Sequence, residues 1–196
     1  MATEDAERRL LERLKRRDEA AFNTLVALHQ GSVYRLLARM LGDPAEAEDV
    51  AQEVFVTVFK ALDGFRGESK LSTWIHRIAT NHARNRLKYH GRRKRGVLRP
   101  IEEGTQQAEG APEIGSRLAR PDQALEGRQA ENNIQLALGS LDEEQRTLIV
   151  LRDLEHMSYE EIQEVTALPI GTVKSRLHRA RMALHQKYTE LSEGKA

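Results

Sequence analysis

Apolar residues recur at steps of three and four along most of this chain, which is the period of an amphipathic helix. The pattern runs from about residue 4 to residue 90 and again from about residue 123 to residue 191, and neither stretch shows the strict alternation of a β-strand. The sequence therefore predicts an all-α fold. We expect two small helical domains, at residues 1–92 and 129–196, joined by a flexible linker at residues 93–128.

The predicted linker is rich in Gly, Pro, Gln and Glu and poor in large apolar side chains. A segment of this composition buries too little surface to offset the entropy that it would lose on ordering. At ~3.3 Å per residue, its full extension would span on the order of 110 Å. We therefore expect the linker to let the two domains sit well apart.

Three helical segments make up most of the first domain. They run over about residues 22–41, over about residues 45–62, and from about Leu71 into a run of Lys and Arg. A Gly-Asp-Pro tripeptide at 42–44 separates the first two segments, and a loop at 63–69 with two glycines separates the last two. The apolar positions expected in the core are Phe22, Leu25, Val26, Val33, Leu36, Leu37, Met40, Val50, Val54, Phe55, Val58, Leu62, Trp74, Ile75, Ile78 and Ala79.

Residues 158–184 are patterned as two short helices around a tight turn. Ser158 and Glu161 fit a capping box, so a helix is expected to start directly after the serine. Pro169 is unfavourable inside a helix but suits a first turn. The chain should therefore break at 167–169, and a second helix should follow.

The second helix of this pair has an apolar stripe on one face and basic residues on the opposite face. The stripe consists of Val173, Leu177, Ala180 and Leu184. The opposite face carries Thr172, Lys174, Ser175, Arg176, His178 and Arg179. No acidic residue occurs from Val165 to Thr189, so this helix can approach phosphates without like-charge repulsion. The arrangement predicts a DNA-reading helix-turn-helix, and an amphipathic helix with a solvated basic face is the alternative.

Charge is segregated along the chain, although the formal net charge is only +1. Residues 69–101 hold ten Lys or Arg and no Asp or Glu, whereas residues 43–53 and 142–144 are acidic.

The chain has no cysteine, which excludes disulfides and Cys-ligated metals. Its charged start lacks an apolar signal core, and no apolar run approaches the roughly 20 residues of a bilayer span. We expect a cytoplasmic protein that is not inserted in a membrane.

One face of the third helical segment mixes amides with cations. Its members are Arg77, Asn81, Arg84, Asn85 and Lys88. Arg and Lys bind phosphates, whereas Asn can form paired hydrogen bonds with a base edge, so the mixture suits selective binding of nucleic acid. A solvated polar helix face is the alternative. The loop directly upstream favours the first interpretation, because its glycines let backbone amides come close to an unstacked base.

With both basic segments in view, the chain resembles the extracytoplasmic-function (ECF) sigma factors of the sigma-70 family, the dissociable bacterial RNA polymerase subunits that select promoters. Four stretches carry this resemblance, in the family's order. They are DAERRLLERLKRRDEAAFNTLVALH, DPAEAEDVAQEVFVTVFKAL, FRGESKLSTWIHRIATNHARNRLKYHGRRKR and SLDEEQRTLIVLRDLEHMSYEEIQEVTALPIGTVKSRLHRARMAL. They resemble, respectively, the opening segment, the polymerase-binding segment, the −10 recognition and melting segment, and the −35 reader.

The resemblance implies a role for individual residues. Those at polymerase-facing positions, which would meet the clamp coiled coil of the largest catalytic subunit, are Asp49, Gln52 and Glu53. The implied −10 contacts, with a pocket for a flipped base, are Phe65, Arg66, Gly67, Ser69, Trp74, Arg77, Asn81, Arg84, Asn85 and Lys88. The implied −35 contacts are Thr172, Lys174, Ser175, Arg176, His178 and Arg179, with Lys174 and Arg179 as the base readers. An anti-sigma factor is the further partner that the resemblance implies.

Two other classes of function are the alternatives to a sigma factor. A stand-alone helix-turn-helix regulator would bind duplex DNA tightly and specifically without polymerase. An enzyme is disfavoured, because the sequence shows no carboxylate cluster, no nucleophile–base pair and no phosphate-cradling glycine motif. None of the seven histidines pairs with a carboxylate at metal-binding spacing on one helix face, so neither a metal nor a cofactor is expected.

Overall fold

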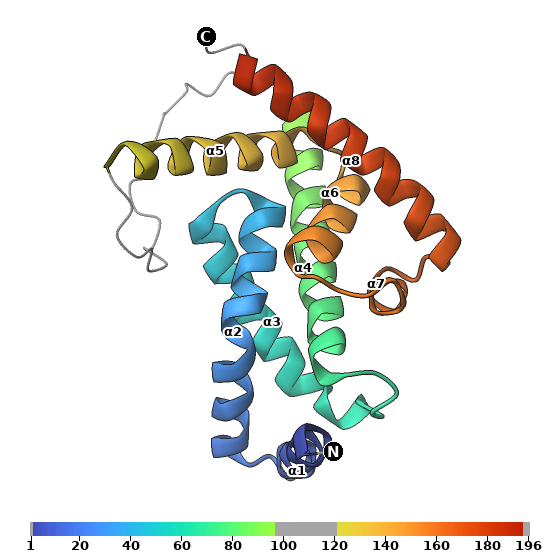
Figure 1. The fold of residues 1–196 in the computed structure, drawn as a ribbon. Coiled ribbons are helices and arrows are strands. Elements are labelled where there is room, and N and C mark those ends of the chain that lie inside the picture. The colour runs from blue at the N-terminus through green and yellow to red at the C-terminus, as the bar shows by residue number, and fades with distance from the viewer. Residues whose placement is uncertain (1, 97–120, 194–196) are drawn as a thin grey trace.

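The computed structural model describes residues 2–96 and 121–193, and every regular element in those residues is a helix (Figure 1). The first half contains α1 (Ala2–Lys15), α2 (Glu19–Leu41), α3 (Pro44–Ala61), the 3-10 turn η1 (Leu62–Gly64) and α4 (Leu71–Gly96). The second half contains α5 (Pro121–Ser140), α6 (Glu143–Ile149), the π-helical turn η2 (Val150–Leu154), α7 (Tyr159–Thr166) and α8 (Ile170–Glu193). The all-α prediction is confirmed.

Local signals place the boundaries of α2 and α3. The side chain of Asp18 accepts a hydrogen bond from the Ala21 amide at 3.2 Å and so caps the start of α2. Gly42 ends that helix with φ of 80°, a left-handed conformation that glycine adopts without steric cost. Asp43 then caps α3, and Pro44 fills its first position, where no amide hydrogen is needed.

Helices α2, α3 and α4 pack against one another and enclose the first core (Figure 1). The predicted apolar positions Leu25, Leu36, Val54 and Ile75 are fully or almost fully buried there. Leu14 of α1 joins them with 1% of its surface exposed. The core therefore holds α3 and α4 in a fixed register, and their polar faces lie outside it.

Helices α7 and α8 form the predicted helix-turn-helix, and α5 and α6 pack against α8. The capping box is present: the Glu161 amide donates to the Ser158 hydroxyl at 3.1 Å, and the Ser158 amide donates to the Glu161 carboxylate at 2.8 Å. Helix α7 ends at Thr166, and α8 begins at Ile170, as predicted. The turn passes through Ala167 in a left-handed conformation, with φ of 58°.

The two halves of the chain are in contact. Helix α4 packs against α7, and α2 packs against α5 and η2. The Arg146 guanidinium of α6 donates to the carbonyl oxygen of Met40 at 2.7 Å, and Gln135 of α5 donates to the carbonyl oxygen of Ala38 at 3.3 Å. Both bonds place the second domain against the carboxyl end of α2.

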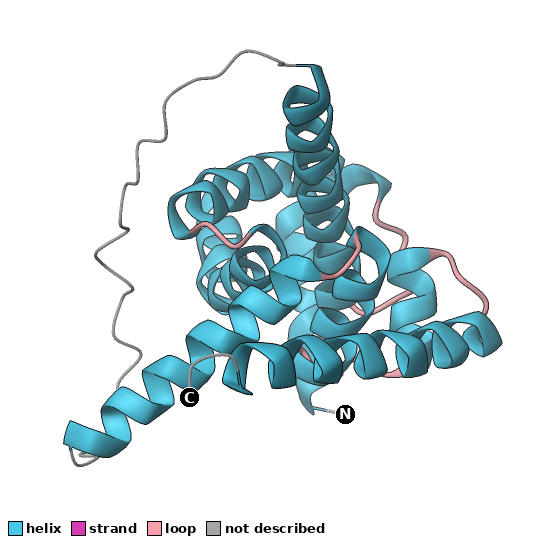
Figure 2. Ribbon diagram, turned by 90° about the horizontal axis from the view of Figure 1, so that it is seen from above, coloured by secondary structure: helices cyan, strands magenta, loops and turns pink. Residues whose placement is uncertain are grey.

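Helix extends into both ends of the segment that was predicted as a linker. Helix α4 continues to Gly96, and α5 already begins at Pro121, so residues 93–96 and 121–128 are helical. Seen from above, short loops connect consecutive helices of each half (Figure 2). The rest of the predicted linker lies outside the described residues. None of the described helices is long and apolar enough to cross a lipid bilayer.

Candidate nucleic-acid and partner interfaces

An open groove runs along the polar face of α3. Asp49, Gln52 and Glu53 are exposed there, and Val56 beside them is 52% exposed. We call this feature the α3 groove; its volume is about 610 Å³, and it is completed by Thr57, His82 and Arg86. The sequence prediction that three polar residues share one exposed face of this helix is confirmed by their positions.

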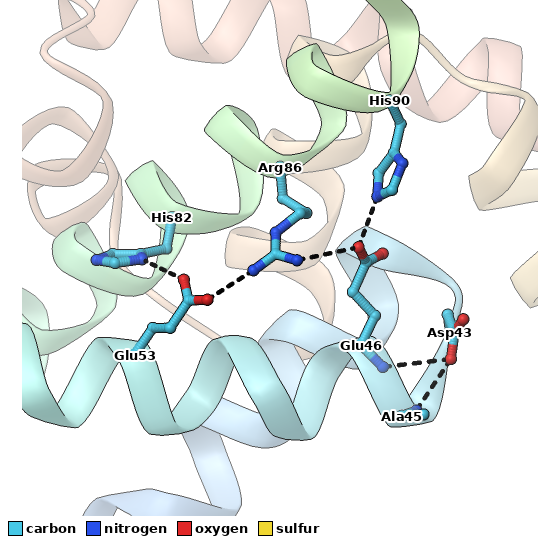
Figure 3. Close-up of polar contacts among 7 residues, drawn as sticks. All are labelled: Asp43, Ala45, Glu46, Glu53, His82, Arg86 and His90. Carbon is cyan, nitrogen blue, oxygen red and sulfur yellow. Dashed lines mark hydrogen bonds and ion pairs between the residues drawn. The ribbon is translucent and has the colours of Figure 1, made fainter. Parts of the chain in front are cut away.

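A chain of polar contacts made by arginine, histidine and glutamate side chains joins α3 to α4 along this groove (Figure 3). The Arg86 guanidinium donates to the Glu53 carboxylate at 2.7 Å and lies 3.6 Å from the Glu46 carboxylate. His82 Nδ1 lies 3.5 Å from Glu53, and His90 Nε2 lies 2.5 Å from Glu46. Glu53 is thus held in place at the groove while about half of its side chain, 51%, faces solvent.

The loop between η1 and α4 is anchored by two aromatic rings. Phe65 is only 4% exposed, and its ring centroid lies 5.0 Å from that of Trp74. Gly67 has φ of 76°, and a side chain at this position would meet no atom within 4 Å. Arg66 and Gly67 are exposed and Ser69 is half-buried. Burial leaves the Phe65 side chain little surface for a base, so in this structure Phe65 supports the loop.

The predicted DNA-reading face of α4 divides into a free part and a bound part. Arg77, Asn81 and Asn85 are exposed, and none of them forms an ion pair or a hydrogen bond with a carboxylate of the described residues. Arg84 instead donates to the Glu143 carboxylate at 2.6 Å, and the Lys88 ammonium lies 3.9 Å from the same group. Glu143 belongs to α6, so the second domain neutralises two of the five predicted contacts.

The corresponding face of α8 is mostly open. Lys174, Ser175, His178 and Arg179 are exposed, as the sequence predicts. Thr172 and Arg176 are half-buried, and Arg176 forms an ion pair with Glu144 of α6. The apolar stripe of this helix faces inward, with Val173, Leu177 and Ala180 buried.

Comparison with known proteins shows which family this chain belongs to. The family model for Sigma-70 region 2 matches residues 25–93, and the model for Sigma-70, region 4 matches residues 131–184. The RNA polymerase sigma-H factor of Pseudomonas aeruginosa is 38% identical over 184 residues, which cover 94% of either chain. The chain belongs to the sigma-70 family. The ECF RNA polymerase sigma factor SigW of Bacillus subtilis is 35% identical over 182 residues, 92% of this chain and 96% of that one.

A solved structure shows the same two-domain fold. It is the sigma factor RpoE from Bartonella quintana, in complex with the anti-sigma factor NepR. Its TM-score is 0.62 at 22% identity, covering 86% of this chain and 96% of that chain. Together with the relatives, the family matches make this chain an ECF sigma factor, a non-enzymatic protein that directs transcription initiation. A stand-alone regulator has no better support.

The sequence analysis does not anticipate two residues beside the predicted −35 face, Tyr159 and Arg152. The Tyr159 ring of α7 lies 5.2 Å from the Lys174 ammonium and 4.8 Å from the guanidinium carbon of Arg152. Arg152 is itself fixed by donating to the carbonyl oxygen of Met157 at 2.5 Å. Aromatic faces attract cations, so Tyr159 gathers positive charge beside the reading helix. Arg152 and Lys174 are far apart in sequence, and no periodic pattern relates them.

Proposed function

We propose that this sigma factor binds core RNA polymerase through the α3 groove, with Asp49, Gln52 and Glu53 as the contacts. The observation that carries the proposal is that Asp49 and Glu53 are exposed on α3, whereas three exposed cations without an ion pair to a described residue, Arg77, Lys174 and Arg179, lie outside this groove on α4 and α8. Arg86 lines the groove but is paired with Glu53. An acidic patch repels DNA, so it suits a protein partner with a basic surface. Val56, which is half exposed and also lines the groove, adds an apolar contact.

We propose that single-stranded −10 DNA binds to the loop after η1 and to the adjoining face of α4. Asn81 and Asn85 are exposed and can form hydrogen bonds with base edges. Arg77, Arg84 and Lys88 supply positive charge for the phosphates, which offsets the few kcal/mol needed to unstack a flipped base. Trp74 and the loop residues Phe65, Arg66, Gly67 and Ser69 frame the pocket, with the Phe65–Trp74 contact as its support.

We propose that duplex −35 DNA binds to α8. Lys174 and Arg179 are the base readers, because both are exposed and neither forms an ion pair with a described residue. The remaining contacts come from Thr172, Ser175, Arg176 and His178. A well-made base contact discriminates by roughly 1–3 kcal/mol, whereas a phosphate contact changes affinity with little sequence preference.

The proposal also covers the domain bounds, the cellular location and a further partner. We propose a polymerase- and −10-binding domain at residues 1–92 and a −35-binding domain at residues 129–196, joined through residues 93–128. The matched family regions, 25–93 and 131–184, support this division. We also propose that the protein works in the cytoplasm and is held inactive by an anti-sigma factor. The inhibitor-bound Bartonella quintana protein of the same fold supports that partner.

Initiation in a purified system tests the proposed function. Core RNA polymerase is mixed with a randomised promoter library, with and without this chain, and the 5′ ends of the RNA products are sequenced. We expect new transcripts that share a −35 and a −10 motif and that require the chain. A stand-alone regulator would instead select duplex sites without polymerase and yield no new start sites.

A further inference from the structure

Carboxylates of the second domain bind cations on α4 and in the loop directly before it, on the surface assigned above to −10 DNA. Three pairs cross between the domains. They are Arg84–Glu143 at 2.6 Å, Lys88–Glu143 at 3.9 Å and Lys70–Glu161 at 2.9 Å. In Figure 1, α6 and α7 lie beside α4, in agreement with these pairs and with the packing of α4 against α7. Arg84 and Lys88 of α4 therefore lie against a protein carboxylate, although about half of the Lys88 side chain still faces solvent.

Glu143 is the centre of this contact. Its side chain is 26% exposed and that of Arg84 is 33% exposed, so water screens the pair only partly. Glu143 lies in the first turn of α6, where the positive end of the helix dipole stabilises a carboxylate. The N-cap hydrogen bond is made by Asp142, which accepts from the Gln145 amide at 2.7 Å. Glu143 is thus free to bind across the domain boundary.

The residue after Glu143 makes a similar ion pair with α8, the helix proposed to bind the −35 element. Glu144 forms an ion pair with Arg176 of α8. Two adjacent carboxylates of α6 therefore engage a cation from each of the two helices that are proposed to bind DNA. Phosphate oxygens would need the same guanidinium groups, and they would be repelled by Glu143 and Glu144 as long as these pairs remain.

Other contacts hold the domains in this arrangement. Arg39 of α2 forms an ion pair with Glu131 of α5, and Arg35 lies 3.8 Å from the Glu155 carboxylate. The Arg146 guanidinium bridges Met40 of the first domain and Leu138 of the second through their carbonyl oxygens, at 2.7 and 2.8 Å. Single-stranded DNA that binds Arg84 and Lys88 must compete with this whole set, because α6 has to leave α4 before these two cations are free.

We propose that the second domain is an intramolecular inhibitor of −10 binding, and that Glu143 is the latch that occupies Arg84 and Lys88 until the domains separate. This inference rests on the proposed function, since it assigns those cations to DNA. A closed state that excludes DNA lowers the apparent affinity by the fraction of molecules that are open. Polymerase, which docks on α3 and needs the two readers at separate promoter elements, would favour the open state.

The first experiment measures how the full-length free protein binds a short, fluorescently labelled single strand of random sequence. The variant Glu143→Gln removes the latch charge and keeps the size of the side chain. The control Glu12→Gln removes the same charge from an exposed position on α1. We expect Glu143→Gln to bind about fivefold more tightly than the wild type and Glu12→Gln to match the wild type. Equal binding by all three proteins would overturn the latch.

The second experiment locks the domains together. The chain has no cysteine, so the double variant Lys70→Cys/Glu164→Cys can be joined by a short, cleavable bismaleimide without side reactions at other thiols. Glu164 is exposed on α7, and its charge acts on Lys70, whereas the capping residue Glu161 and the latch Glu143 stay intact. We expect the linked protein to lose at least tenfold in single-strand binding and in initiation with core polymerase, and cleavage of the link to restore both.

The two proposals fail in distinguishable ways. If the linked protein initiates transcription as well as the cleaved protein, the inhibitor model is wrong while the sigma-factor function stands. If neither the cleaved protein nor the wild type initiates transcription with core polymerase, the proposed function itself is wrong.

Discussion

The two helices that are proposed to read DNA, α4 and α8, are both long and cationic, yet they present their charge differently. On α4, Arg84 and Lys88 are neutralised by Glu143 of the other domain. On α8, Lys174 and Arg179 are exposed without an ion pair to any described residue. Positive charge in a sequence therefore does not show how accessible that charge is in the folded protein. In the free protein, most of the proposed −35 face of α8 is open, whereas Glu143 occupies two cations of the proposed −10 face of α4.

The largest expected effect is a loss of affinity for core polymerase when the α3 groove, which lies apart from both proposed DNA-reading faces, is altered. The double variant Asp49→Arg/Glu53→Arg reverses the charge of the α3 groove, and we expect its affinity for core polymerase to fall on the order of 100-fold. Titration of labelled protein with core polymerase measures this affinity. The control Glu12→Arg/Glu193→Arg makes the same charge change at exposed sites outside the groove. Similar losses in both double variants would refute a specific acidic interface.

The next largest effect is a loss of −35 discrimination by α8. Arg179→Ala should cost roughly 1–3 kcal/mol of discrimination between the preferred −35 sequence and a mismatched one. Arg176→Ala should cost less discrimination, because Glu144 already binds that guanidinium. Competition binding of the holoenzyme to matched and mismatched promoters provides the measurement. An unchanged preference in Arg179→Ala would remove this residue from the set of base readers.

The stability contributed by the buried face of α4, unlike that of α8, should depend on pH. The inward positions of α8 are aliphatic, whereas α4 carries His76, whose Nε2 is buried without a hydrogen-bond partner among the described residues. Burial lowers the pKa of His76 to about 4; His29 and Arg35 of α2 oppose its protonation, and Glu161 of α7 favours it. Because this pKa lies below the value in the unfolded chain, the stability that His76 contributes is complete above about pH 6.5 and is lost as the pH falls.

We therefore expect the wild type to lose about 1 kcal/mol more unfolding free energy than His76→Leu between pH 7.5 and pH 5.5. Urea unfolding of both proteins at the two pH values measures this difference. Other titrating groups contribute equally to both proteins and cancel in the comparison. Parallel pH dependence in the two proteins would contradict the assignment of this effect to His76.

The smallest effect concerns the contact between Lys174 of α8 and the aromatic ring of Tyr159. Tyr159→Phe keeps the aromatic face beside the Lys174 ammonium, and Tyr159→Leu removes it. A partly exposed cation–π contact contributes about 0.5–1 kcal/mol, so Tyr159→Leu should lose about two- to fivefold in −35 discrimination. Tyr159→Phe should retain the wild-type ratio. If both variants lose it equally, the hydroxyl group and not the ring is what matters.

Features that depend on nearby residues could be predicted from the sequence. The capping box joins Ser158 to Glu161, only three residues apart, and the break before α8 follows from Pro169. The apolar stripes of α3 and α8 were also correct, because helical period alone decides which side chains face inward. These signals were sufficient for the fold class and for the positions of both readers.

Features that depend on distant residues could not be predicted in this way. Arg84 and Glu143 are 59 positions apart, and Arg86 and Glu53 are 33 apart, so no local pattern announces either pair. The same holds for the burial of Phe65, which follows from its contact with Trp74 across a loop. The low apolar content of residues 93–128 indicated a linker, but it gave no sign that helix continues to Gly96 and resumes at Pro121.

A sigma factor works as a subunit of RNA polymerase, so the decisive measurement is titration of the purified chain against bare core RNA polymerase, without DNA. We expect a stoichiometric one-to-one complex that withstands gel filtration and starts transcripts when promoter DNA is added. Separate elution of the chain and the polymerase at every concentration tested would rule out a role as a polymerase subunit.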